Sequence, residues 1–181
     1  MDDIDYIYFK LKGTRFRIDP NNSYNLQKLY TKNGRRFVKK PYWRKVSIYP
    51  NDVGYLLCSV GGKPCRHHRI VYYAHNQDWN IDDSCCNNTV DHEDWNRSNN
   101  QISNLRLATQ SQQQQNKNVK GCYFDTNKQR WIARINHEGK RTYIGAFLTE
   151  ELARAAYLKA KAKYHPFYRG GSGLGVPPSV T

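Results

Sequence analysis

The stretch that decides the fold is VDHEDWN, residues 90–96, followed by Asn99-Asn100 and by SNLR, residues 103–106. A valine leads into an acid that sits beside a histidine, and an Asn-rich loop follows. We expect a short strand that delivers Asp91 and His92 to the start of this loop. Because side chains alternate along a strand, these two residues are expected to point to opposite faces.

This pair of residues suits the hydrolysis of a phosphodiester bond. The reaction needs an activated water and a positive charge that stabilises the crowded phosphorane, and one hard divalent cation supplies that charge. Hard cations prefer oxygen ligands, which the carboxylate of Asp91 provides. A neutral imidazole, with an ordinary pKa of about 6.5, can act as general base without binding the metal. The residues therefore predict Asp91 as a metal ligand and His92 as the base.

Residues 43–117 resemble an HNH nuclease domain of the phage and intron homing type. The resemblance rests on the pattern VDHxDxNxxNNxxxNLR at residues 90–106, with the upstream element HRIV at residues 68–71. It implies a ββα-metal fold, in which a two-stranded hairpin packs on a helix and holds one magnesium or manganese ion. It also implies that Asn104 is a catalytic residue whose amide orients the loop and the base.

The helix that should complete the metal site departs from the family's pattern. The family usually places asparagines there, whereas this chain reads SQQQQN at residues 111–116. By register Gln113 stands where the metal-binding asparagine is expected, and Asn116 lies one turn further. Either Gln113 or Asn116 binds the metal, or metal affinity is weakened. The last case keeps open a catalytically inactive, DNA-binding regulator.

The upstream element adds three basic residues with less defined roles. His68 is expected to be a structural residue or a phosphate contact rather than a metal ligand, and the argument for His67 is weaker still. Arg69 belongs to the same element and is predicted to contact DNA.

Residues 118–168 form a second pattern of alternating strands and a helix. Residues 130–135 alternate strictly, Glu138-Gly139 predicts a tight turn, and Thr149 is expected to cap a helix with acids in its first turn. Alanines and tyrosines at helical spacing predict a helix that lies close on a three-stranded sheet. Residues 169–181 read as a flexible tail.

This module resembles the plant ethylene-responsive-factor DNA-binding domain, the AP-two fold. The resemblance is carried by KGCY at residues 120–123, RWIARI at 130–135, GKRTYIGAF at 139–147 and TEELARAAY at 149–157. It implies that the sheet enters the major groove opposite the helix, as a two- or three-stranded ribbon can. Trp131 is ambiguous between a core residue and a DNA contact. The expected DNA-binding residues are Arg130, Trp131, Arg134, Lys140, Arg141 and Lys120.

Residues 1–42 read as strands, with a hairpin signal at Asn33-Gly34. The basic residues around that signal leave two readings open, a scaffold or an accessory DNA-binding hairpin.

The composition of the chain narrows the classes of molecule that the protein is expected to bind. The formal net charge is +14 in 181 residues, which favours nucleic acid over an anionic membrane surface. No apolar run approaches the roughly 20 residues of a spanning helix, and no signal-peptide core follows Met1. Five cysteines without a secretory signal indicate reduced thiols and an intracellular location. A structural zinc site from Cys58, Cys65 and Cys85-Cys86 is possible, but adjacent cysteines are poor tetrahedral ligands.

The sequence thus predicts an α+β protein with four parts. These are a β-rich accessory region (1–42), an HNH nuclease domain with a ββα-metal core (43–117), an AP-two-like domain (118–168) and a tail (169–181). The expected function is a site-specific, magnesium- or manganese-dependent DNA endonuclease acting on double-stranded DNA. Whether it acts as monomer or dimer, and on one strand or both, stays open.

Overall fold

The computed structural model describes residues 4–33, 36–83, 85 and 87–168. They form an α+β fold whose described strands pair antiparallel. The described part divides into two compact units. The first takes in the residues up to His92 together with Asn96–Thr109, and the second takes in Glu93–Trp95 together with the residues from Gln110 onward. These units differ from the predicted ranges, because residues 4–42 share one unit with residues 43–92 and 96–109.

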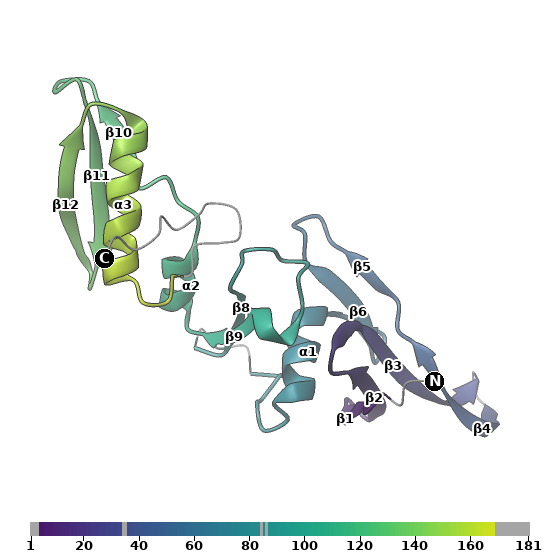
Figure 1. Cartoon of the computed structure of the whole chain (residues 1–181). Helices are drawn as coiled ribbons and strands as arrows, with labels where there is room; N and C mark the ends of the chain where they lie inside the picture. The colour runs from purple at the N-terminus through teal and green to yellow at the C-terminus, as the bar shows by residue number, and fades with distance from the viewer. Residues whose placement is uncertain (1–3, 34–35, 84, 86, 169–181) are drawn as a thin grey trace. The chain divides into compact units, whose positions relative to one another are not determined.

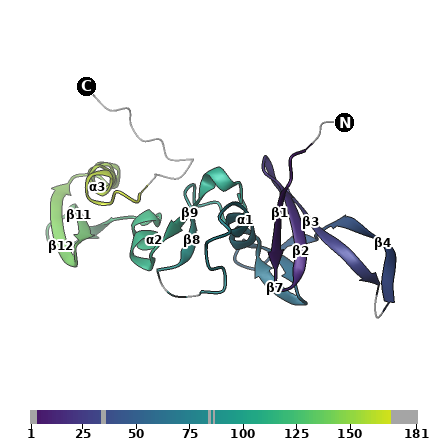
Figure 2. The same cartoon turned by 90° about the horizontal axis from the view of Figure 1, so that it is seen from below.

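The first unit opens with a four-stranded sheet in the order β1-β2-β3-β4 (Figure 1). Its strands are β1 (Ile7–Leu11), β2 (Thr14–Asp19), β3 (Asn22–Asn33) and β4 (Arg36–Lys45). The antiparallel pairing of β3 with β4 confirms the hairpin expected at Asn33-Gly34, although residues 34–35 of its turn lie outside the described residues. Figure 2 shows this hairpin extending away from the helix of the unit.

The rest of the first unit carries the predicted motif. A second sheet, β5 (Ile48–Pro50), β6 (Leu56–Val60) and β7 (Lys63–Arg66), leads into α1 (His67–His75). The predicted strand is β8 (Thr89–His92), and after the 3-10 turn η1 (Ile102–Asn104) it pairs with β9 (Leu105–Ala108). Helix α1 contacts both strands of this hairpin.

One hydrophobic core joins these pieces. Phe16 and Leu26 of the first sheet pack with Val60, with Ile70 of α1 and with Val90 of β8. Residues far apart in the sequence therefore support the motif together, and the N-terminal strands are part of its framework.

The second unit contains α2 (Gln110–Asn116), β10 (Cys122–Asp125), β11 (Arg130–His137), β12 (Lys140–Phe147) and α3 (Glu150–Tyr164). The predicted three-stranded antiparallel sheet packed on one helix is confirmed. The hydroxyl of Thr149 accepts from the Leu152 amide at 3.3 Å, which is the expected cap. The predicted tail, residues 169–181, lies outside the described residues.

Three two-residue turns set the register of their hairpins. Lys12-Gly13, Gly61-Gly62 and Glu138-Gly139 each have positive φ at both positions. This is the type I′ geometry, whose twist matches that of the strands it joins. Among the described residues, no helix is long and apolar enough to cross a membrane.

Candidate active site

The β8–β9 hairpin places the acid and the histidine of the motif on opposite faces. Asp91 lies across from Arg106 and His92 lies across from Leu105. Alternation along β8 leaves Asp91 partly accessible and turns His92 inward, where it is 5% exposed.

Asp91 is paired with a cation from the neighbouring strand. Nη2 of Arg106 lies 3.3 Å from Oδ2 of Asp91, and the two side chains are 13% and 16% exposed, respectively. Arg106 thereby holds the carboxylate in a fixed place. It also offsets the negative charge that a metal ion would meet there.

His92 is held by an amide side chain. Nε2 of His92 lies 2.8 Å from Oδ1 of Asn100, and Nδ2 of the same amide lies 2.9 Å from Nδ1 of His67. Asn100 and His67 are both 0% exposed, so this row of side chains is buried.

The polarity of these bonds fixes the protons. An amide oxygen only accepts, so the proton of a neutral His92 lies on Nε2 and its lone pair lies on Nδ1. An amide nitrogen only donates, so His67 accepts at Nδ1 and carries its own proton on Nε2. Asn100 thus selects one tautomer in each ring.

Two aromatic rings complete the surroundings of His92. The ring of His68 meets it edge-on with centroids 4.8 Å apart, and the ring of Tyr55 lies 6.1 Å away. Burial lowers the pKa of His68 to about 2 and that of His67 to about 4. Both histidines are therefore neutral at physiological pH and add no charge beside the base.

The neutral state of both rings agrees with their packing. Nδ1 of His68 is buried without a hydrogen-bond partner among the described residues, and for His67 burial outweighs a backbone hydrogen bond at Ser23 that raises its pKa. The structure thus favours the structural reading of His68 over a phosphate contact, because the ring is 2% exposed.

The loop between β8 and η1 is held at residues 97–99 by three hydrogen bonds. Nδ2 of Asn104 donates to the carbonyl of Asn99 at 2.8 Å, next to the amide that holds the base. The hydroxyl of Tyr24, from β3, donates to the Ser98 carbonyl at 2.6 Å. Nη1 of Arg97 donates to the Val53 carbonyl at 2.8 Å. Asn104 therefore braces the loop that carries Asn100.

Arg69 is engaged inside the protein. Its guanidinium donates to the backbone carbonyls of Ile81, Asp83 and Asn88, at 2.6 to 3.3 Å, and lies 4.8 Å over the ring of Trp79. These contacts hold the long loop between α1 and β8. Arg69, which the sequence predicted to contact DNA, therefore has a structural role in this loop.

The predicted metal ligands fall in both units. Asp91 supplies a hard carboxylate oxygen at the end of β8 in the first unit. Gln113 and Asn116 lie on α2 in the second unit, where Gln113 is half-buried and Asn116 is 2% exposed. Carboxylate and amide oxygens of this kind are ligands that suit magnesium or manganese.

The cysteines do not form a cluster in the part of the chain that is described. Cys58 and Cys65 are cross-strand neighbours on β6 and β7, and Cys85 is exposed. Among the described residues, no group of three or more His, Cys, Asp or Glu side chains is placed to hold a metal. Cys86, the last candidate zinc ligand, lies outside the described residues.

The predicted DNA-binding residues of the second unit divide between the two faces of its sheet. Cross-strand register and alternation put Arg130, Arg134 and Arg141 on the face away from α3. Trp131 instead packs against the hydrophobic core on the side of the sheet that faces α3, which agrees with its interpretation as a core residue. Lys120 lies 4.7 Å over the Trp131 ring and pairs with Glu150 at 2.9 Å, while Lys140 is exposed at the turn of the β11–β12 hairpin.

Sequence reasoning missed the side chains that position the base. Asn100 was visible only as one of several asparagines after the motif, and Tyr24 and Tyr55 gave no signal at all. Their roles depend on contacts across 8 to 76 positions of the chain. Comparison with protein-family models, with curated proteins and with solved structures gave no match.

Proposed function

We propose that this protein is a site-specific DNA endonuclease that hydrolyses phosphodiester bonds with one magnesium or manganese ion and His92 as general base. The observation that carries the proposal is the buried His92, fixed in one tautomer by Asn100, directly after the carboxylate of Asp91. The order of elements along the chain, β8 then β9 then the helix α2, is also the order that a ββα-metal core has.

In this proposal each side chain has a separate task. Nδ1 of His92 takes the proton of the attacking water, and the bond from Nε2 to Asn100 holds the ring in place. Nδ2 of Asn100 is anchored on His67, so the amide cannot turn over without losing both bonds. Asp91 would hold the cation, and the sequence offers Gln113 and Asn116 as the candidates for a further oxygen ligand. When bound, the cation neutralises the developing phosphorane charge and the leaving oxygen.

The second unit is proposed to supply site selection. Arg130, Arg134 and Arg141 share the open face of its sheet, where arginine can bond guanine edges bidentately. Lys140 and Lys120 are proposed as phosphate contacts, which add affinity without reading sequence. Joining this sheet to a nuclease raises the effective concentration of the nuclease at the bound site.

A specific observation favours a second candidate, a DNA-binding regulator without activity. Arg106 already forms an ion pair with the carboxylate of Asp91. The helix that the sequence predicts to complete the metal site carries glutamines in place of asparagines. If Arg106 stays on the carboxylate when DNA binds, the cation has a weak site and the protein binds without cutting.

Supercoiled plasmid distinguishes these candidates. The purified full-length protein is incubated with plasmid and Mg²⁺ or Mn²⁺, and in parallel with EDTA. Nicked or linear product that needs the metal supports the endonuclease. Retarded but uncut plasmid under both metals would instead establish the regulator.

A further inference from the structure

The β3–β4 hairpin extends beyond the sheet that anchors it. The ladder between β2 and β3 ends at the pair Phe16–Lys28, whereas β3 and β4 stay paired out to Asn33–Arg36. The outer part of the hairpin is therefore a two-stranded ribbon, and it carries exposed side chains rather than core.

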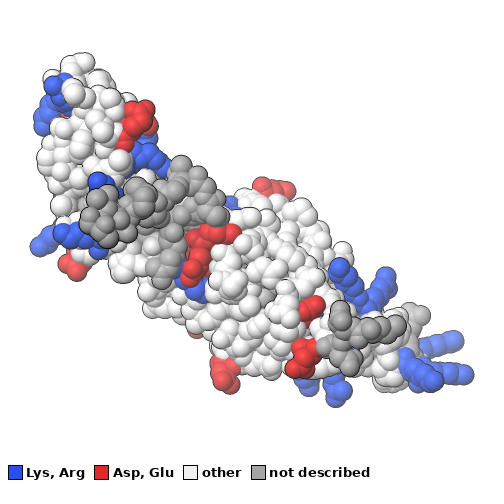
Figure 3. All heavy atoms as spheres, in the orientation of Figure 1, with Lys and Arg blue, Asp and Glu red and all other residues white. Residues whose placement is uncertain are grey.

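Charge is concentrated on this ribbon. Residues 20–51 contain eight Lys and Arg and no Asp or Glu, so this segment alone accounts for +8 of the net charge of +14. Figure 3 shows blue side chains gathered at the end of the molecule where Figure 1 places β4. Five of these eight cations fall within residues 29–43, which make up the ribbon and its turn, and like charges so close together repel one another.

Aromatic rings hold the cations in position. The rings of Tyr30 and Tyr42 stack across the strands with centroids 5.7 Å apart, and Lys28 lies 5.1 Å over Tyr30. Further out, Lys32 lies 4.4 Å over Phe37, whose own surface is 75% exposed. Cations and flat apolar surface thus alternate along one face.

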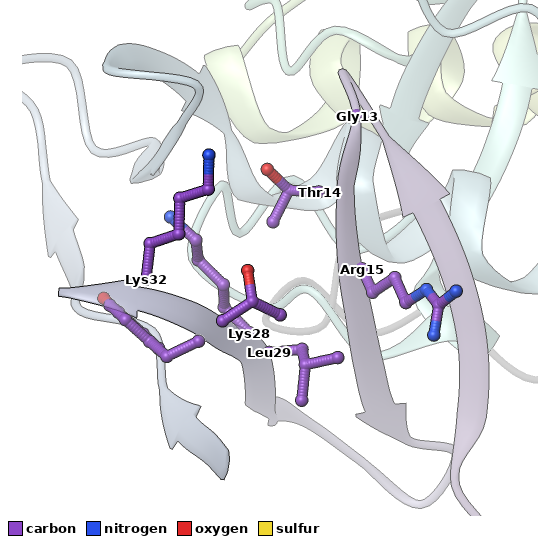
Figure 4. Close-up of a pocket in the computed structure, with 8 residues that line it drawn as sticks. Gly13, Thr14, Arg15, Lys28, Leu29 and Lys32 are labelled. Carbon is purple, nitrogen blue, oxygen red and sulfur yellow. The ribbon is translucent and has the colours of Figure 1, made fainter. Parts of the chain in front are cut away.

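A hollow of about 520 Å³ lies beside the point where the pairing of β2 with β3 ends and β3 continues, paired with β4 alone. It is lined by Gly13, Thr14, Arg15, Lys28, Leu29, Tyr30, Thr31 and Lys32. Figure 4 shows Lys32 and Thr14 reaching into the same space from β3 and β2. Ammonium and hydroxyl groups around one open hollow are the donors that phosphate oxygens accept from.

We propose that the β3–β4 ribbon is a second DNA-binding surface, which grips the phosphate backbone of duplex DNA. A two-stranded ribbon fits along a groove of the duplex, and exposed lysines on it can each displace a condensed counterion. The choice of DNA as the polyanion rests on the proposed function. The Tyr24 contact to the loop of His92 starts from the same strand, β3, so the ribbon and the base belong to one framework.

Salt dependence of binding tests this surface. In the full-length protein, Lys32→Gln, Lys39→Gln and Lys40→Gln are combined, and affinity for a short duplex of random sequence is measured in EDTA over a range of salt. Three lost phosphate contacts lower the slope of log K against log salt by about 2 to 3, at about 0.9 per contact. The matched control combines Lys63→Gln, Lys159→Gln and Lys163→Gln, which removes the same charge from exposed positions elsewhere.

The expected result is a lower slope for the ribbon variant and a slope near that of wild type for the control, with equal thermal midpoints for all three proteins. Equal slopes for the two variants overturn the proposal. Loss of binding to phosphatidylserine vesicles with unchanged duplex binding also overturns it, in favour of a membrane surface. Because EDTA prevents cutting, the ribbon can pass this test even if the protein proves not to be a nuclease.

Discussion

A single amide decides how His92 can react. Asn100 bonds Nε2 of His92 through its oxygen and Nδ1 of His67 through its nitrogen, so the orientation of one side chain sets the protons of two rings. In the proposed reaction, a lone pair that is fixed in direction loses less freedom when it meets the attacking water, which is the advantage that positioning gives to proton transfer.

Asn100→Ala therefore lowers the rate of metal-dependent plasmid nicking by about 10- to 100-fold, the range seen when a supporting hydrogen bond is removed from a reactive site. The same change leaves the buried Nδ1 of His67 without its donor and costs about 1 to 3 kcal/mol of stability. Single-turnover rates and urea unfolding measure the two effects. Full activity in a destabilised Asn100→Ala protein would show that the amide serves folding alone.

The buried histidines make stability depend on pH. The pKa of His67 is lowered to about 4 and that of His68 to about 2, whereas both rings titrate near 6.5 in the unfolded chain. The unfolded state therefore binds protons more readily, and the stabilisation present above about pH 6.5 is lost as pH falls toward the folded values. As the pH falls from about 7 to about 5, each of the two buried rings lowers the free energy of unfolding of the protein by about 2 kcal/mol.

Urea unfolding across this pH range checks the expectation, with His68→Gln as the comparison. The variant should lose about half of the pH dependence, since one of the two buried rings is gone. An unfolding free energy that is the same at both ends of the range would contradict the neutral, buried state of these rings.

At the scale of elements, local signals predicted the second unit well. The alternation of residues 130–135, the positive-φ turn at Glu138-Gly139 and the Thr149 cap all act over a few residues, and the structure confirms each. The apolar run at residues 68–73 carries no such local signal, because its β-branched and aromatic residues suit a strand as well as the helix α1 that forms there. Burial of Ile70 and Val71 against the core decided for the helix.

Gly121 is the tightest point between sheet and helix in the second unit. Its φ is +73°, and a Cβ placed there would overlap the ring of Tyr157 on α3. Gly139 has a similar φ of +74° with open space around it. Gly139→Ala therefore costs about 1 to 2 kcal/mol for backbone strain alone, and Gly121→Ala costs about 1 to 3 kcal/mol more because the helix must move.

Thermal unfolding of the two glycine variants measures the difference. Equal losses would mean that α3 does not lie against Gly121. Because the backbone strain is nearly the same in both, the comparison isolates the packing of the helix on the sheet.

At the scale of the whole molecule, the sequence predicted the Asp91-His92 motif but not the side-chain contacts that hold His92 in place. The Asp91-His92 strand and its hairpin partner follow from a local pattern, while the hold on His92 comes from Asn100, from His67 on α1 and from Tyr24 on β3. No local pattern reports contacts between such distant positions. For the same reason residues 4–42, which the sequence set apart as an accessory region, share a core with the motif.

The most direct test of the account is the rate at which full-length protein nicks supercoiled plasmid with Mg²⁺, compared with His92→Ala and with His75→Ala as a control from the far end of α1. The account predicts that His92→Ala lowers the single-turnover rate by about 10²- to 10⁴-fold while DNA binding is retained, and that His75→Ala stays near wild type. Nicking by His92→Ala at the wild-type rate would contradict His92 as the base.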